Sequence, residues 1–436
     1  MKRASSKEIF GWAMFDFANQ AYTLLIITVI FGDLFTRVIV GDAHSDYRLG
    51  NLLWSIALAV SYLLVVLSGP VAGAIMDFSA ARKRFLFASY VLTVVSTSLL
   101  YFVAPGYIWL GMALIVVSNF AYAIGESFIA SFLPELGPRE ELGWISGFGW
   151  ALGYVGGLVA TAFALVALGE VSEENFERIR WVGPFAAVFF LVAAIPTFLW
   201  LRERGRARRL PGLRQYVGIG FRRVRATLGD LAHYRDLTIL MVSVFFAMAG
   251  IYIIISFTFI YGAQVIQWDE KVRVWMFITV QLTAAVGALA FGFLQDRVGA
   301  RRTYVATLSL WVVAVTLIFA TPWLGRFLDF EAQYVFLVVG SVAGLCLGST
   351  QSAGRALVGV LSPRSRAAEF FGFWGLSGKL AAIVGLLGLG FLQVLFGLHL
   401  SILFCALLFG LALLAALRLD ETRGRRVAEA RESRRG

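Results

Sequence analysis

The stretch GFLQDRVGARR, residues 292–302, decides how the chain is organised. It places a glycine, an aspartate four residues later and a basic pair between two strongly apolar runs. An earlier stretch, GAIMDFSAARK at residues 73–83, has the same spacing and also lies between apolar runs. A carboxylate followed by a basic pair, repeated at one spacing, predicts a chain made of two copies of one membrane unit.

The composition is typical of a membrane protein. The 436 residues are 59% hydrophobic and 15% charged, and the mean hydropathy is +0.79, whereas a soluble chain has about 25% charged residues. A run of about 20 apolar residues can cross a bilayer as a helix. The net charge of +11 falls in short loops, where it indicates membrane orientation. We therefore expect no nucleic-acid partner.

The apolar runs predict an all-α integral membrane protein, with twelve transmembrane helices in two pseudo-symmetric six-helix bundles. Turn-forming pairs such as Pro105-Gly106 and Gly183-Pro184 separate the runs. The predicted spans are Trp12–Val38, Leu52–Met76, Phe85–Ala104, Tyr107–Leu133, Leu142–Leu168, Trp181–Leu201, Leu237–Tyr261, Val274–Leu294, Thr303–Ala320, Tyr334–Ala353, Phe370–Phe396 and Leu398–Leu417.

The basic residues predict the orientation of these spans. Most of the 38 Lys and Arg residues fall on one side, together with both termini, and positively charged loops stay in the cytoplasm. We expect a monomeric, multi-pass protein of a bacterial cytoplasmic (inner) membrane, with both termini cytoplasmic.

Four regions follow from the spans. Residues 1–201 form a first bundle, 202–236 a cytoplasmic linker, 237–420 a second bundle and 421–436 a basic cytoplasmic tail. In the linker, apolar residues three or four apart alternate with arginines, which predicts a basic amphipathic helix suited to an anionic inner leaflet. A plain tether that keeps the bundles together explains the same pattern, and a regulatory or partner-docking role is the alternative. The apolar positions are Leu213, Val217, Phe221, Val224, Leu228 and Leu231.

Polar residues inside the predicted spans are the functional candidates, because polar groups in lipid are costly unless they face a cavity or a partner. The first span carries Asp16, Asn19 and Gln20 at the spacing of neighbours on one helix face. The fourth span carries a similar stripe of Asn119, Tyr122 and Glu126. The other candidates for substrate binding or coupling are Tyr154, Gln281, Gln351, Arg355 and Lys379.

Glu126 and Lys379 are the leading candidates. A carboxylate buried in a bundle can exchange a proton near neutral pH, so proton coupling is a hypothesis that rests on Glu126. Lys379 can hold a carboxylate-bearing substrate, or pair with Glu126 when the site is empty. Static ion pairs explain both residues as well. Asp16 can act as a cap or latch instead of a substrate contact, and Arg355 as a gate residue.

Glycines of the two halves also correspond. Gly147 maps to Gly372 and Gly153 maps to Gly378. Glycine lets membrane helices approach closely, so we expect packing roles for most of these positions.

The arrangement of six plus six spans, with a Gly-x-x-x-Asp and basic loop after spans 2 and 8, resembles the major facilitator superfamily. The resemblance implies cytoplasmic latches that bridge helix ends while the outer side is open and release when the cytoplasmic side opens. The basic residues alone are also explained as orientation signals. The candidate latch residues are Gly73, Asp77, Arg82, Lys83, Gly292, Asp296, Arg297, Gly299, Arg301 and Arg302.

The first latch departs from the pattern. Phe78 stands where a basic residue is usual, and Ala80 stands where the second copy has Gly299. We therefore expect unequal latches, with Asp296 more important for transport than Asp77.

Three further stretches resemble the autophagy-related vacuolar amino-acid effluxer family and its bacterial relatives. They are GWAMFDFANQA at 11–21, SGFGWALGYVGG at 146–157 and AEFFGF at 368–373. The resemblance implies a permease. In yeast-type members of that family the activity is efflux of amino acids from a vacuole.

These observations predict a secondary active transporter and not an enzyme. It would move a small polar solute, with an amino acid as the favoured substrate, by rocking alternating access. The chain has no phosphate-binding loop and no metal-ligand spacing, so we expect no cofactor, with proton coupling as the open possibility. Two alternatives remain: an exporter of lipophilic compounds, given the 15% aromatic content, and a non-transporting membrane sensor or scaffold.

Overall fold

The computed structural model describes residues 3–42, 48–169, 171–204, 213–229 and 233–433, and all regular secondary structure in these ranges is helical. Eleven helical segments within them are long and apolar enough to cross a membrane. The bent pair Leu395–Ser401 and Leu403–Leu417 makes a twelfth if it is counted as one span. The chain is a multi-pass membrane protein, and the predicted all-α class is confirmed.

The first bundle contains the helices before residue 201. Its first crossing runs unbroken from Ser6 to Val40, because wider π-helical turns at Thr23–Val29 and Phe35–Val40 extend α1 and α2. The helices are α1 (Ser6–Tyr22), α2 (Phe31–Leu34), α3 (Arg48–Ser79), α4 (Arg82–Leu99), α5 (Ile108–Ala130), α6 (Leu133–Leu136), α7 (Leu142–Leu168), α8 (Phe176–Ile179), α9 (Val182–Ala193) and α10 (Ile195–Trp200).

The second bundle ends in a bend that the sequence pattern did not show. Gly397 has a φ of +75°, which glycine adopts readily, and the chain bends by 62° between Leu395–Ser401 and Leu403–Leu417. The predicted boundary between the spans Phe370–Phe396 and Leu398–Leu417 falls at this non-helical glycine, and the 62° bend divides the predicted last span after Ser401. The helices are α12 (Arg235–Tyr261), α13 (Glu270–Val298), α14 (Ala300–Leu328), α15 (Ala332–Leu361), α16 (Ala367–Ser401) and α17 (Leu403–Leu417).

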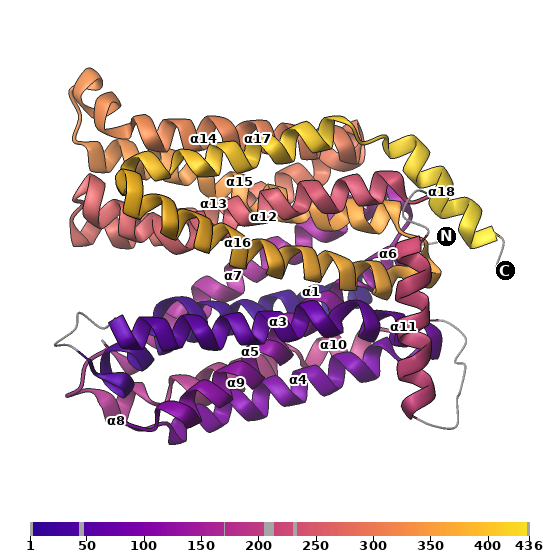
Figure 1. The fold of residues 1–436 in the computed structure, drawn as a ribbon, viewed down its shortest axis with the longest axis horizontal. Coiled ribbons are helices and arrows are strands. Elements are labelled where there is room, and N and C mark those ends of the chain that lie inside the picture. The colour runs from indigo at the N-terminus through magenta and orange to yellow at the C-terminus, as the bar shows by residue number, and fades with distance from the viewer. Residues whose placement is uncertain (1–2, 43–47, 170, 205–212, 230–232, 434–436) are drawn as a thin grey trace.

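Both ends of the chain lie at the same end of the two bundles, which is called the termini end below (Figure 1). It also carries α11 (Leu213–Gly229) and α18 (Glu421–Ser433). Helix α11 runs across the ends of the membrane helices and packs on α3. Its Val217 and Phe221 are exposed. The side chains of Leu213 and Leu228, and Leu231 entirely, lie outside the described residues.

The two bundles contact each other where α3 packs on α16 and where α7 packs on α13. Glycines lie at both contacts. A methyl group on Gly73 would lie 2.1 Å from the carbonyl oxygen of Ala368, and one on Gly147 would lie 2.3 Å from that of Ala288. Only glycine permits these approaches. The packing explanation does not apply to Gly378, since no heavy atom outside its own helix lies within 4 Å of a Cβ placed there.

We predict that Gly73→Ala lowers the temperature of thermal unfolding in detergent, because overpacking of this kind costs about 1–3 kcal/mol. The matched control is Gly410→Ala in α17, where an added Cβ meets nothing within 4 Å. There alanine should leave stability unchanged or raise it, since alanine is a better helix former by about 1 kcal/mol. Equal shifts for the two variants would show that the α3–α16 contact is not tight.

Candidate functional site

An ion pair between the two bundles lies in the interior of the molecule. The ammonium of Lys379 on α16 lies 2.9 Å from Oε2 of Glu126 on α5. The Lys379 side chain is 8% exposed and the Glu126 side chain is 25% exposed. Each charge thus neutralises the other where an unpaired charge would be costly. The pairing that the sequence suggested for an empty site is present.

Tyrosines hold both members of this pair. The hydroxyl of Tyr252 on α12 accepts a hydrogen bond from Lys379 at 3.1 Å, and the Lys379 ammonium lies 5.3 Å from the centre of the Tyr62 ring, within cation–π range. The hydroxyl of Tyr122 donates to Oε1 of Glu126 at 3.0 Å. Sequence reasoning missed Tyr62 and Tyr252. A tyrosine in the middle of an apolar span is the signal that could have identified them.

A second ion pair also joins the bundles. Arg355 on α15 donates to Oδ2 of Asp16 on α1 at 2.7 Å, and to the hydroxyl and carbonyl oxygens of Ser146 near the start of α7 at 3.1 and 2.9 Å. The rings of Trp12 and Trp150 lie 4.7 and 5.1 Å from its guanidinium carbon. Since Asp16 and Ser146 belong to the first bundle, this cluster has to rearrange if the bundles separate here.

A small cavity touches both ion pairs. Its lining carries charges of both signs, side-chain amides and two indole rings, and its volume of about 20 Å³ leaves room for little more than one water molecule in this conformation. The lining residues are Asp16, Asn19, Gln20, Glu126, Trp150, Arg355 and Trp374. Trp150 and Trp374 were not among the candidates from the sequence.

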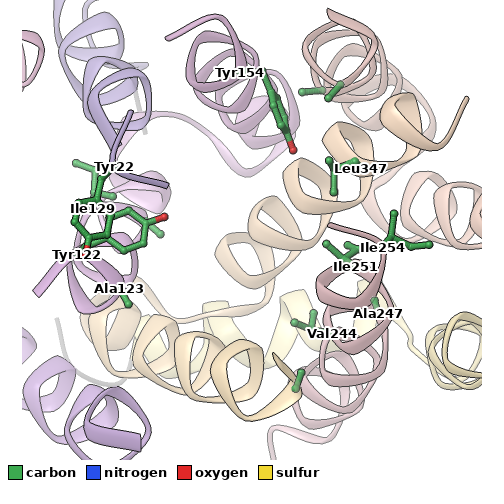
Figure 2. Close-up of a cluster of buried hydrophobic side chains, with 14 of the residues drawn as sticks. Tyr22, Tyr122, Ala123, Ile129, Tyr154, Val244, Ala247, Ile251, Ile254 and Leu347 are labelled. Atoms are coloured by element: carbon green, nitrogen blue, oxygen red, sulfur yellow. The ribbon is translucent and has the colours of Figure 1, made fainter. Parts of the chain in front are cut away.

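Buried apolar and aromatic side chains surround this region (Figure 2). On the side of the first bundle, the rings of Tyr22 and Tyr122 stack with centroids 4.6 Å apart. On the side of the second bundle, α12 contributes Val244, Ile251 and Ile254. These walls make the surroundings of the ion pairs less polar than water, which strengthens the charge interactions, while the Glu126 side chain is still 25% exposed to solvent.

The remaining candidates mainly connect helices. Gln351 on α15 donates to the hydroxyl of Tyr154 on α7 at 3.0 Å, which is another bond between the bundles. Asn119 is fully buried and donates to Ser61 at 2.5 Å within the first bundle, so it supports α3 and α5. Gln281 is buried in α13. In the described part of the chain no group of three or more His, Cys, Asp or Glu residues is arranged to hold a metal ion.

The two latch aspartates make the same kind of contact at the termini end. Asp77 accepts the backbone N–H groups of Ala368 and Glu369 at 3.2 and 2.9 Å, at the start of α16. Asp296 accepts those of Gly143 and Trp144 at 2.9 and 2.8 Å, at the start of α7. Each carboxylate therefore binds the positive end of a helix in the opposite bundle.

The first latch is the more extensively bonded one. Arg82 lies 2.7 Å from Asp77 and 2.7 Å from Glu135, and it is almost fully buried. Arg82 also donates to the carbonyl oxygen of Arg364 in the second bundle at 3.0 Å. Ala80 takes a φ of +47° where Gly299 takes +100°, so the substitution does not prevent the turn. The sequence led us to expect the Asp296 latch to be the more important one. The contacts instead favour the Asp77 latch.

The other basic latch residues bind elsewhere or face solvent. Lys83 donates to the carbonyl oxygen of Leu201 at 2.6 Å. Arg301 donates to the carbonyl oxygen of Leu417 at 2.7 Å, within the second bundle. Arg297 and Arg302 are exposed, which suits the orientation role that was the alternative for these residues.

We predict that Asp77→Asn opens the termini end more than Asp296→Asn does, because it removes one of the two carboxylate partners of Arg82 as well as the charge at a helix end. The reporter is a single cysteine, Ser352→Cys, at the α7–α15 contact in a chain whose Cys346 and Cys405 are replaced by alanine. Asp77→Asn should raise its maleimide labelling rate about tenfold and Asp296→Asn about threefold. The reverse order would restore the expectation drawn from the sequence.

Comparison with protein families finds a match to the family described as vacuole effluxer Atg22 like, over residues 52–144 and 139–429. An uncharacterized MFS-type transporter of Bacillus subtilis (strain 168), YxiO, is 26% identical over 392 residues, which is 88% of each chain. Autophagy-related protein 22-1 of Neosartorya fischeri is 22% identical over 300 residues. That match covers 65% of this chain and 49% of the fungal protein.

Solved structures show a likeness of fold. The proton:xylose symporter XylE, of the major facilitator superfamily, superposes with a TM-score of 0.75 at 15% identity, over 97% of this chain and 98% of that one. The human organic anion transporter MFSD10 (TETRAN) superposes with a TM-score of 0.69 at 16% identity, over 94% and 97% of the chains. The fold is therefore the two-bundle major facilitator fold.

Proposed function

Since the chain belongs to the vacuole effluxer Atg22-like family of the major facilitator superfamily and is a secondary transporter, we propose that its substrate is a zwitterion, most simply an amino acid. The observation that carries the proposal is the ion pair of Glu126 and Lys379, which spans the two bundles at 2.9 Å. The substrate would bind between these two side chains.

The chemistry of an amino acid matches this pair. Its ammonium can bind Glu126 and its carboxylate can bind Lys379, so one charge-assisted bond is exchanged for two and no charge is left unpaired. The hydroxyls of Tyr122 and Tyr252 keep the two protein charges in position. A substrate with a single charge would leave one of the two protein charges without a partner, which is unfavourable in the interior of the bundle.

Rocking of the bundles would carry the substrate across. In the described part of the chain, the hydrogen bonds and ion pairs that join the bundles at Asp16, Asp77, Glu126 and Tyr154 lie at the centre and at the termini end. Because positively charged loops stay inside, we assign the termini end to the cytoplasm of a bacterial cell and this conformation to the outward-facing state. Efflux by a monomer, with α11 on the anionic inner leaflet, belongs to the same proposal.

The alternatives have less support. An exporter of lipophilic compounds would need an uncharged aromatic cavity, but this cavity is lined by Asp16, Glu126 and Arg355 as well as by tryptophans. A static scaffold would not need inter-bundle latches, and the relatives of the chain are transporters.

We predict that amino acids, but not their decarboxylated or deaminated analogues, raise the thermal unfolding temperature of the purified protein and exchange across proteoliposomes. Lys379→Met should weaken the apparent affinity about tenfold or more, as expected from loss of a charge-assisted bond. Lys271→Met, which removes an exposed lysine, is the matched control and should behave as wild type. Single-charge analogues binding as tightly as the amino acid would refute the zwitterion site.

We also propose that Glu126 couples transport to protons. Glu126→Gln should abolish the dependence of net transport on a pH gradient and retain exchange of substrate between the two sides, because glutamine keeps a hydrogen-bond acceptor but cannot release a proton. Glu177→Gln removes a glutamate whose side chain is 81% exposed and serves as the control. Gradient-driven transport that survives in Glu126→Gln would remove this residue from the coupling mechanism.

A further inference from the structure

The C-terminal helix α18 lies at the termini end, next to the second bundle (Figure 1), and its side chains also reach the first bundle. The sequence identified this segment only as a basic tail. In the structure it is a helix from Glu421 to Ser433, and its Ala428 is fully buried. The helix is therefore packed against the rest of the protein, through contacts with both bundles.

One part of α18 is fixed to the second bundle. Arg423 binds both carboxylate oxygens of Asp236, at the start of α12, at 2.7 Å each. Glu421 accepts the backbone N–H of Arg301 at 2.8 Å. Gly424 lies so close to α15 that an added Cβ would be 2.7 Å from the side chain of Leu361. The start of α18 must therefore move with the second bundle.

The other part of α18 reaches the first bundle. Oε1 of Glu432 accepts a hydrogen bond from Arg139, just before α7, at 2.9 Å. The same oxygen accepts the backbone N–H of Arg364, between α15 and α16, at 2.8 Å. Arg425 pairs with Glu140, beside Arg139. The Glu432 carboxylate thus links the two bundles at the end where they have to separate, beside a direct hydrogen bond from Arg139 to the carbonyl oxygen of Val360 in α15.

We propose that α18 is an ionic clasp that favours the state closed at the termini end, and that salt on this side of the membrane loosens it. The partners are arranged for this role. Arg139 is 5% exposed and Glu432 is 26% exposed, whereas Arg425 and Glu140 are 38% and 55% exposed. Salt screens ion pairs that solvent can reach, while buried Ala428 and the Asp236 anchor keep the helix attached to the second bundle.

The clasp differs from the two latches. Asp77 and Asp296 bind backbone N–H groups between membrane helices, whereas α18 lies outside the membrane-spanning part and acts through side-chain ion pairs that include Arg139 and Glu432. The helix can therefore change the balance between open and closed states without altering the substrate site. The inference concerns the conformational equilibrium and does not depend on the identity of the substrate.

The test measures labelling of the Ser352→Cys reporter in the purified full-length protein without substrate. Raising the salt from about 20 mM to about 300 mM should speed labelling of the parent about threefold or more, because the Debye length falls from roughly 20 Å to below 10 Å. Glu432→Gln should raise the labelling rate at low salt about threefold to tenfold and reduce the salt dependence, with the remaining dependence coming from the more exposed pair of Arg425 and Glu140.

The matched control is Glu429→Gln, on the same helix. It makes the same change in net charge, but Glu429 approaches Arg139 only to 3.9 Å, and its 3.0 Å pair with Arg425 lies within α18 and does not join the bundles, so labelling should stay within about twofold of the parent. A chain that ends at Asp420 should behave like Glu432→Gln. Equal rates for Glu432→Gln and Glu429→Gln, or an unchanged salt dependence in Glu432→Gln, would overturn the clasp and leave the proposed substrate site untouched.

Discussion

The ion pair of Glu126 and Lys379 crosses the boundary between two bundles that have to move relative to each other. Separating the bundles at this level would leave two charges without partners in a poorly solvated interior, which is strongly unfavourable. The movement therefore becomes accessible when something else satisfies the charges, either a molecule that carries both charges or a proton on the carboxylate. A single electrostatic requirement connects binding, coupling and conformational change.

The contacts at the termini end differ in kind from the central pair. The latch carboxylates at Asp77 and Asp296 bind backbone N–H groups at the starts of helices, and such helix-end interactions are modest, typically about 0.3–1 kcal/mol each. They lie at the rim of the bundles, so breaking them brings groups toward solvent instead of isolating them in the interior. Several modest contacts, including those of α18, can thus hold the end closed and still release within a transport cycle.

The periodicity of the sequence was enough to predict the membrane class, the two-bundle arrangement and the polar stripes. Glu126 and Lys379 could be selected because a charge inside an apolar span needs a partner or a function. Tyr62 and Tyr252 could have been selected as tyrosines within apolar spans, but their contacts with Lys379 could not be predicted, since they come from other helices and meet it only through packing. The partners of Asp77 are the backbone N–H groups of Ala368 and Glu369. Such groups are common to all residues except proline, so the sequence does not reveal these contacts.

Two details were misjudged for reasons of local conformation and tertiary context. Ala80 stands where the second copy has Gly299, which led us to expect a weaker first latch, but it takes a left-handed φ of +47° at a cost of about 1–2 kcal/mol beside the Asp77–Arg82 pair. The tail looked like an orientation signal, because its arginines alone say nothing about Asp236 or Arg139. Both cases depend on which distant residues the fold brings together.

The most direct test of alternating access around the central pair is a distance measurement at both ends of the bundles in the same protein. Spin labels would be placed on the first and second bundles at the termini end, and a second pair at the opposite end, in membranes with and without the amino acid found to bind. The account predicts opposite changes: the distance at the termini end grows as the distance at the other end shrinks, and Lys379→Met suppresses the response to substrate. Distances that stay fixed at both ends, or that change in the same direction, would contradict it.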